Sequence, residues 1–168
     1  MRNHPVSKGV STREPVGEPG TWFADRRGTI LNRFVLDCSV CHAGCFEDEV
    51  TPYSDRVLDS LATSMVTVPA VWALEVANVL TLSERRGRIT VSKSAKFLAF
   101  LTDLPSQIDE RSMRSVFPEI LRLARSWRLT AYDAAYLEVA LHEGIPIATR
   151  DTALRKAAAR AGLPEFSA

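Results

Sequence analysis

From residue 33 onward, short apolar runs alternate with longer segments of helical periodicity, and this alternation constrains the fold more than any other feature. The short runs predict buried strands at residues 34–36, 65–68, 107–109 and 145–149. The longer segments predict helices at residues 40–46, 53–61, 69–86, 91–104, 116–127, 130–143 and 152–161. Helices between successive strands indicate βαβ units, so the predicted fold is a three-layer α/β/α domain with a short, mainly parallel sheet.

Composition limits the class of protein further. The chain has 168 residues, enough for one domain whose core needs no disulfide or metal for stability. Hydrophobic residues make up 46% and charged residues 24%, which excludes a fibrous or wholly disordered chain. The net charge of +1 argues against a broad basic surface that stays bound to nucleic acid.

The first 32 residues differ in composition from the rest. They hold four of the eight glycines and three of the nine prolines, and they show neither strand nor helix periodicity. We therefore expect a flexible N-terminal extension at residues 1–32 and the folded domain at residues 33–168. A start codon assigned too far upstream would explain the same composition, and the sequence does not choose between the two explanations.

Cysteine usage and hydropathy indicate the compartment. Cys38, Cys41 and Cys45 form an odd set within eight residues, which does not suit a secreted disulfide framework. They share one helical stripe and are better interpreted as buried small side chains than as zinc ligands. No apolar stretch follows the basic N-terminus, and residues 65–82 are too polar to span a membrane. We expect a soluble, cytoplasmic protein with no membrane partner.

Two aspartates follow predicted strands. Asp37 comes directly after residues 34–36, and Asp151 follows residues 145–149 after one intervening residue. Because parallel strands end at one edge of a sheet, both side chains are expected at that edge. Either residue could instead cap the helix that follows it, which stabilises a helix by about 1 kcal/mol. For Asp37 taken alone, capping is the simpler interpretation.

Two further carboxylates lie on predicted helices. Residues 71–80 are apolar except at Glu75 and Asn78, which are three residues apart and share a face. A carboxylate on a buried helix is costly without a cation, donors or a water-filled cleft, so a site role is favoured over a buried ion pair. Asn78 is either a supporting donor or a packing residue. Asp133 and Thr130 have the spacing of a capping box, which is compatible with a site at the helix start.

Considered together, the four carboxylates indicate a cation site. If Asp37, Glu75, Asp133 and Asp151 lie within about 5 Å of one another, each close pair repels by roughly 3 kcal/mol. Such a cluster must hold protons or bind cations. Oxygen ligands suit Mg²⁺, with Mn²⁺ as the alternative, and these ions take the rest of their shell from water and phosphates. That chemistry is phosphodiester hydrolysis.

Four segments that contain these acids resemble a known family. Residues 34–39 (FVLDCS), 69–80 (PAVWALEVANVL), 132–137 (YDAAYL) and 148–151 (ATRD) look like the four acidic motifs of the PIN domain. Their order and spacing are similar to those of the VapC-type toxins of bacterial toxin–antitoxin pairs. The resemblance extends from residue 33 to about residue 163, and four motifs in order are more specific than any one of them.

The resemblance implies a Mg²⁺-dependent endoribonuclease in which the metal orients and deprotonates a water. Four residues match the catalytic and metal-binding acids, which we call the acidic quartet: Asp37, Glu75, Asp133 and Asp151. Ser39 and Thr149 match supporting hydrogen-bonding positions. The implied partners are an RNA substrate, a VapB-like antitoxin and a second copy in a homodimer. The sequence departs from the pattern near Gly44, where relatives often carry a bulky aromatic residue.

Two alternatives remain. One is a non-catalytic PIN-like module that binds RNA or protein, and four converging acids argue against it. The other is a phosphohydrolase of the haloacid dehalogenase type, which also uses an aspartate after the first strand. That type requires a second aspartate two residues later, where this chain has Ser39.

Overall fold

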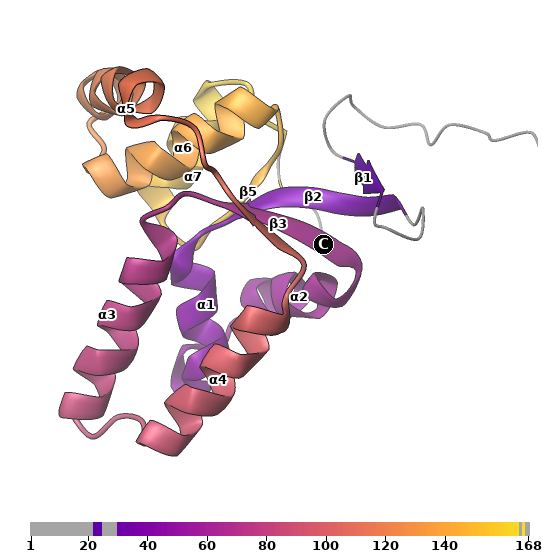
Figure 1. The fold of residues 1–168 in the computed structure, drawn as a ribbon, viewed down its shortest axis with the longest axis vertical. Helices are drawn as coiled ribbons and strands as arrows, with labels where there is room; N and C mark the ends of the chain where they lie inside the picture. Colours follow the sequence, from indigo (N-terminus) through magenta and orange to yellow (C-terminus); the bar gives the residue numbers. More distant parts are fainter. Residues whose placement is uncertain (1–21, 25–29, 165, 167–168) are drawn as a thin grey trace, which may run out of the picture.

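A computed structural model describes residues 22–24, 30–164 and 166 of the chain (Figure 1). The strands are β1 (Trp22–Ala24), β2 (Ile30–Leu36), β3 (Ser64–Val68), β4 (Ser106–Ile108) and β5 (Ile147–Ala148). The helices are α1 (Cys38–Cys45), α2 (Pro52–Ser60), α3 (Trp72–Arg85), α4 (Val91–Asp103), α5 (Met113–Trp127), α6 (Ala131–Glu143) and α7 (Thr152–Arg160). Short 3₁₀ turns lie at Glu47–Glu49 and Leu61–Thr63. Each predicted strand and helix is present, with ends shifted by a few residues.

The sheet is mainly parallel, as predicted. Strand β2 pairs in parallel with β3 and β5, and β3 pairs in parallel with β4, whereas β1 is antiparallel to β2. The register places Val35 opposite Thr67 and Leu36 opposite Ala148. The carboxyl ends of β2, β3 and β5 therefore meet at one edge of the sheet, which is where a parallel α/β domain builds its site.

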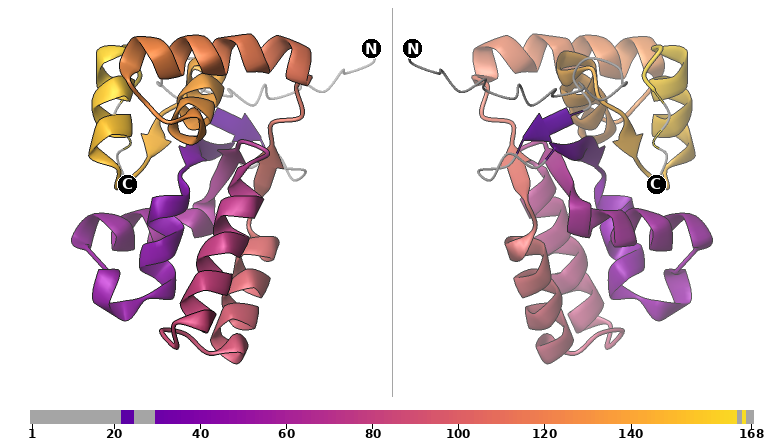
Figure 2. Two further views of the ribbon diagram at one scale, coloured as in Figure 1. Left: turned by 90° about the vertical axis from the view of Figure 1, so that its left-hand side faces the viewer. Right: turned by 90° about the vertical axis from the view of Figure 1, so that its right-hand side faces the viewer.

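Helices cover both faces of the sheet and complete three layers. Figure 2 shows α5, α6 and α7 on one side of the strands and α1 to α4 on the other. The core is centred on β2, whose residues Phe34, Val35 and Leu36 have no exposed surface. Helix α6 is buried from Ala134 to Ala140, because it packs against β2, β3 and β5. The predicted three-layer α/β/α fold is confirmed.

The expected N-terminal extension needs a correction. Residues 22–24 form β1, and β2 begins at Ile30 rather than near Arg33, with Trp22 paired opposite Asn32. The polar residues Asn32 and Arg33 conceal the start of this strand, because backbone pairing at the end of a sheet needs no apolar alternation. Residues 1–21 and 25–29, where the rest of the expected extension falls, lie outside the described residues.

The helix that carries Glu75 also differs from expectation. Pro69 does not open it: the Pro69 carbonyl accepts a hydrogen bond from the Trp72 N–H at 2.9 Å in a turn that precedes α3. Nor is α3 buried on every side, since Val76 and Leu80 are buried whereas Leu74 is 71% exposed. The rest of the domain covers only some of the apolar residues of α3, so one apolar side of the helix is exposed.

Candidate active site

Asp37 lies at the carboxyl end of β2 and is buried, with 7% of its surface exposed. It occupies the N-cap position of α1, but its side chain makes no cap hydrogen bond. Instead, Asp37 Oδ2 accepts hydrogen bonds from the hydroxyls of Ser39 and Thr149, each at 2.5 Å. The carboxylate therefore lacks the regular N-cap hydrogen bond, but it stays at the start of α1, because Ser39 belongs to the first turn of that helix.

The two hydroxyls link the loop after β5 to the first turn of α1. Ser39 Oγ accepts the Arg150 N–H at 2.9 Å, and Thr149 Oγ1 accepts the Asp151 N–H at 2.9 Å. Because each hydroxyl oxygen accepts from a backbone donor, its own proton is directed at Asp37. Ser39 and Thr149 thus lie where the sequence predicts hydrogen-bonding support.

Glu75 lies in the first turn of α3 and is partly buried. Its Oε2 accepts a hydrogen bond from the hydroxyl of Tyr136 on α6 at 2.5 Å. Burial raises the pKa of Glu75, the Tyr136 hydrogen bond opposes the rise, and the charges of Asp37 and Asp133 add to it. Burial also raises the pKa of Asp37, against the Ser39 and Thr149 hydrogen bonds and with a contribution from Asp133. Carboxylates that follow β2 and lie on α3 and α6 therefore repel one another at one edge of the sheet.

Asp133 lies at the start of α6, where the predicted helix cap is present. Thr130 Oγ1 accepts the Asp133 N–H at 3.1 Å, and the Thr130 hydroxyl donates to Asp133 Oδ2 at 2.7 Å. The cap holds the carboxylate close to the first turn of the helix. Its charge acts on both Asp37 and Glu75, so capping and membership of the acidic cluster coexist.

Asp151 is exposed and caps α7, because its Oδ1 accepts the Leu154 N–H at 2.7 Å. Its connection to Asp37 runs through Thr149, which accepts the Asp151 N–H and donates to Asp37. Asp37, Glu75 and Asp133 thus lie close enough for their charges to affect one another. Asp151 is linked to Asp37 through Thr149. Asn78 is exposed one turn beyond Glu75 and makes no hydrogen bond to the quartet within the described part of the chain.

The donors at this edge are oxygens, which is the chemistry that Mg²⁺ and Mn²⁺ prefer. Across residues 30–164, no cation forms an ion pair with Asp37, Glu75 or Asp133. Equally, the described residues contain no group of three His, Cys, Asp or Glu side chains already gathered to hold an ion. The donor set fits a hard divalent cation, and the acids lie near one another without a preassembled shell.

The three cysteines lie on α1, the helix that begins just after Asp37. Cys38 and Cys41 are buried and Cys45 is partly buried, as the sequence predicts. Burial raises the pKa of Cys41 to about 12, and burial also raises that of Cys38. The thiols therefore stay protonated at neutral pH and are poor metal ligands. His42 lies 3.3 Å from Cys38 Sγ, and burial lowers its pKa.

Sequence reasoning missed the contact between Tyr136 and Glu75. Tyr136 is part of an otherwise apolar run and has 1% of its surface exposed. Its position three residues after Asp133 was the available signal, since that spacing puts both residues on one face of a helix.

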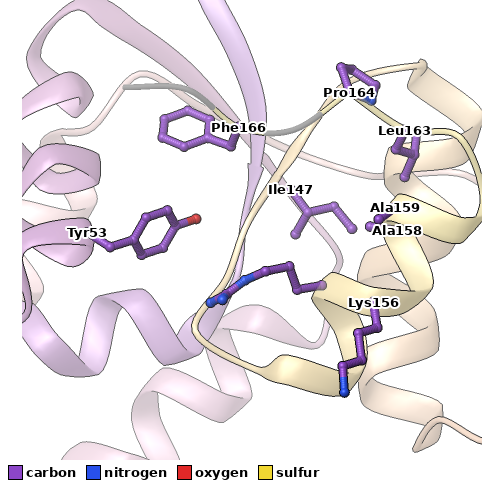
Figure 3. A pocket seen from close by; sticks show the side chains of 9 residues that line it. Tyr53, Ile147, Lys156, Ala158, Ala159, Leu163, Pro164 and Phe166 are labelled. Carbon is purple, nitrogen blue, oxygen red and sulfur yellow. The ribbon is translucent and has the colours of Figure 1, made fainter.

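A largely apolar pocket of about 270 Å³ lies behind the loop that carries Thr149 (Figure 3). None of the acidic quartet lines it. Tyr53, which does, accepts the Thr149 N–H through its hydroxyl at 3.2 Å, and Arg155 donates to the Thr149 carbonyl at 3.0 Å. The pocket thus lies beside Tyr53 and Arg155, which bond the backbone of Thr149, and not beside the acids themselves.

A mainly parallel α/β/α domain belongs to the class of proteins that build their sites at the carboxyl edge of the sheet, where this chain has Asp37. Within that class the family is defined: the PIN domain model matches residues 34–160, and the chain belongs to the PIN domain family. PIN domains are generally a nuclease fold, and such nucleases use divalent metals.

Among solved structures, the chain is similar to the crystal structure of PAE2754 from Pyrobaculum aerophilum. The two share 22% sequence identity with a TM-score of 0.57, over 74% of this chain and 85% of that one. This likeness supports the fold. A comparison with curated proteins gives no match. No helix within the described residues is long and apolar enough to cross a membrane.

Proposed function

We propose that this PIN domain is a Mg²⁺-dependent endoribonuclease, with Mn²⁺ as the alternative ion, and the toxin of a toxin–antitoxin pair. One observation carries the catalytic part of the proposal: Asp37 lies at the carboxyl end of β2, and Tyr136 of α6, the helix that begins with Asp133, bonds Glu75 of α3. The three acids are close enough to raise the pKa of Asp37 and of Glu75, beyond the larger effect of burial. Bringing like charges together at the end of a sheet costs stability unless a cation offsets it. A metal-dependent phosphodiesterase uses such a cation.

The acidic quartet would hold the ion, with Asp37 as the buried ligand and Glu75, Asp133 and Asp151 around it. The bound ion would supply a water of lowered pKa and a positive charge for the scissile phosphate. The Ser39 and Thr149 hydroxyls orient Asp37, and their donation favours its ionised form against the effect of burial. The residues of the chain thus prepare an ionised, oriented oxygen ligand.

RNA as the substrate and the VapC-type toxin role rest on the resemblance of the four motifs in order. The same resemblance supports a VapB-like antitoxin, a homodimer and a cytoplasmic location. A protein partner would also cover exposed apolar side chains on α3, α4 and α5: Leu74, Val91, Leu98, Met113 and Phe117. The sheet edge where Asp37, Glu75 and Asp133 lie, called the acidic edge below, suits an antitoxin segment that inserts an arginine or lysine.

The competing proposal is a non-catalytic PIN-like module that binds RNA or protein. It requires no cation, so a charge-removing substitution at Asp37 separates the two proposals. Asp37→Asn keeps an oxygen that accepts from Ser39 and Thr149 and removes the charge. Asp59→Asn is a matched control, because Asp59 is an exposed residue of α2.

The experiment compares wild type, Asp37→Asn and Asp59→Asn for growth arrest on expression and for RNA cleavage in vitro, with Mg²⁺ and with a chelator. We expect cleavage by wild type and Asp59→Asn to stop when the metal is chelated, and Asp37→Asn to neither arrest growth nor cleave. Equal toxicity and metal-independent cleavage in all three proteins would exclude the nuclease mechanism.

A further inference from the structure

Glu75 is held at the acidic edge by a residue from the opposite layer of the domain. Its helix, α3, has an open side on which Leu74 is 71% exposed and Ala77 is also exposed. A glutamate on such a helix can turn its carboxylate into solvent. Here it is turned inward, toward Asp37 and Asp133, and meets the hydroxyl of Tyr136 at 2.5 Å.

The inward orientation is unfavourable unless something offsets it. Fixing a glutamate side chain costs conformational entropy. Partial burial and repulsion from two neighbouring carboxylates add to this cost. The hydrogen bond from Tyr136 is the interaction that opposes these effects, and a bond to an ionised acceptor is among the stronger ones.

Tyr136 is a rigid anchor. Its side chain has 1% of its surface exposed, and the helix around it packs against β2, β3 and β5. The Tyr136 hydroxyl donates to Glu75 Oε2, and a tyrosine phenol, with its ordinary pKa of about 10, keeps that proton at neutral pH. The position of the phenol is therefore set by the core rather than by solvent.

We propose that Tyr136 is a positioning residue whose hydroxyl fixes the Glu75 carboxylate at the acidic edge, so that Glu75 can share a divalent cation with Asp37. The inference rests on the proposed function. The phenol bonds Glu75 Oε2, so Oε1 would be the oxygen left to bind the cation. Helix α6 then contributes twice, with Asp133 at the surface of the site and Tyr136 beneath it.

The test measures Mn²⁺ binding to the full chain by isothermal titration calorimetry after removal of metal, which requires no substrate. Tyr136→Phe keeps every carbon atom of the buried ring and removes the hydroxyl. Tyr132→Phe is the matched control, since Tyr132 is on the same helix and 57% exposed. Loss of a residue that orients a metal ligand typically weakens affinity by at least tenfold. We expect about a tenfold loss of Mn²⁺ affinity for Tyr136→Phe and none for Tyr132→Phe.

Glu75→Gln and the double variant with Tyr136→Phe test the route of the effect. If Tyr136 acts through Glu75, Glu75→Gln weakens Mn²⁺ binding and the added Tyr136→Phe change weakens it no further. In cleavage assays, the Mg²⁺ concentration for half-maximal activity of Tyr136→Phe rises by a factor similar to its loss of Mn²⁺ affinity. Thermal unfolding of the metal-free proteins reports any purely structural effect.

The outcomes separate this inference from the proposed function. Tyr136→Phe that melts earlier but binds Mn²⁺ like wild type, while Glu75→Gln binds weakly, makes Tyr136 a structural residue and overturns the inference alone. A double variant that binds more weakly than Glu75→Gln also overturns it, because Tyr136 then acts by another route. Wild-type affinity in Glu75→Gln itself removes Glu75 from the metal site and contradicts the proposed function.

Discussion

At the scale of single residues, the acidic edge keeps its carboxylates close together at a cost to stability. Asp37 and Glu75 both have raised pKa values, with burial as the main cause and neighbouring carboxylates as a further one. Hydroxyl donors from Ser39, Thr149 and Tyr136 oppose the rise without cancelling it. Such a balance is expected where function requires charge in a place that folding alone would leave neutral.

The raised pKa of Glu75 fixes the sign of a pH effect. A carboxyl whose folded pKa lies above its unfolded value, here 4.5, contributes stability below that value and loses it as pH rises through the folded pKa. The amide that replaces this carboxyl in Glu75→Gln stays neutral at every pH. In metal-free buffer at pH 7, we therefore expect Glu75→Gln to be more stable than wild type in urea unfolding, by no more than about 1 kcal/mol because solvent screens the partly buried side chain.

The same difference should shrink as the pH falls to about 3, well below the unfolded pKa of 4.5, where Glu75 is protonated in both states. Glu84→Gln, at the other end of α3, is the control and should show no such gain. Lower stability of Glu75→Gln at pH 7 would mean that the Tyr136 hydrogen bond outweighs burial and repulsion, contrary to the direction of the pKa change.

At the scale of secondary structure elements, one aspartate follows β2 and another follows β5, and the two do different work. Asp151 caps α7 through the Leu154 N–H, whereas Asp37, at the start of α1, accepts two hydroxyls. The difference arises from partners rather than from position, because Ser39 and Thr149 compete for the carboxylate of Asp37. The capping of α7 by Asp151 can therefore be tested separately from its proposed metal binding.

Substitutions at Asp151 separate the two functions. Asp151→Ala removes the cap of α7 and should cost about 1 kcal/mol of unfolding free energy. Asp151→Ser keeps a capping oxygen and removes the charge, so its stability should lie close to that of wild type. If Asp151 also holds the metal, Asp151→Ser should need a higher Mg²⁺ concentration for cleavage. Urea unfolding and a Mg²⁺ titration of RNA cleavage measure the two effects; unchanged metal dependence would leave Asp151 as a cap alone.

These elements also show what the sequence could predict. Alternation of apolar runs with helical periods predicts the order of strands and helices, since both depend on local spacing. It does not predict that Leu74 is exposed, because the apolar pattern of α3 does not say how many of its sides find neighbours. The contact from Tyr136 to Glu75 joins residues 61 positions apart, and no local pattern contains it. The position of Asp37 was predictable, but its partner Thr149, 112 positions away, required the fold or the family resemblance.

At the scale of the whole molecule, Arg111 connects the far edge of the sheet to the helix that carries Asp133 and Tyr136. Its guanidinium donates to Asp109, just after β4, and to the buried Glu138 on α6, in both cases through two nitrogens. Burial alone would raise the pKa of Asp109, but the hydrogen bonds and charge of Arg111 make it lower than usual. The two layers of the domain are thus joined by one cation between two carboxylates.

Arg111→Met should leave the buried Glu138 and the partly buried Asp109 without a cation. Breaking a fully buried ion pair from one side costs about 3–5 kcal/mol, and because this pair is partly exposed we expect a loss of roughly 2–3 kcal/mol. Arg122→Met, which breaks an exposed pair with Glu119, should cost no more than about 1 kcal/mol. Because a lowered pKa stabilises above the unfolded value of 3.8 and is lost as pH falls, the Arg111 effect should narrow toward pH 3. Urea unfolding at pH 7 and pH 3 measures both; equal losses for the two variants would contradict the bridging role.

The proposed ion should stabilise the whole domain, because it binds the folded state. A ligand that binds only the folded state at a hundredfold its dissociation constant adds about 2.7 kcal/mol of stability. For a domain of this size, that corresponds to a rise of roughly 5–10 °C in Tm. We expect Mn²⁺ at such a concentration to raise the Tm of wild type and Asp59→Asn, and excess chelator to reverse the rise. Asp37→Asn should show little or no rise, because it lacks the buried charge that faces the ion. An equal rise in Asp37→Asn would place the stabilising ion elsewhere, since no other change distinguishes this variant from wild type.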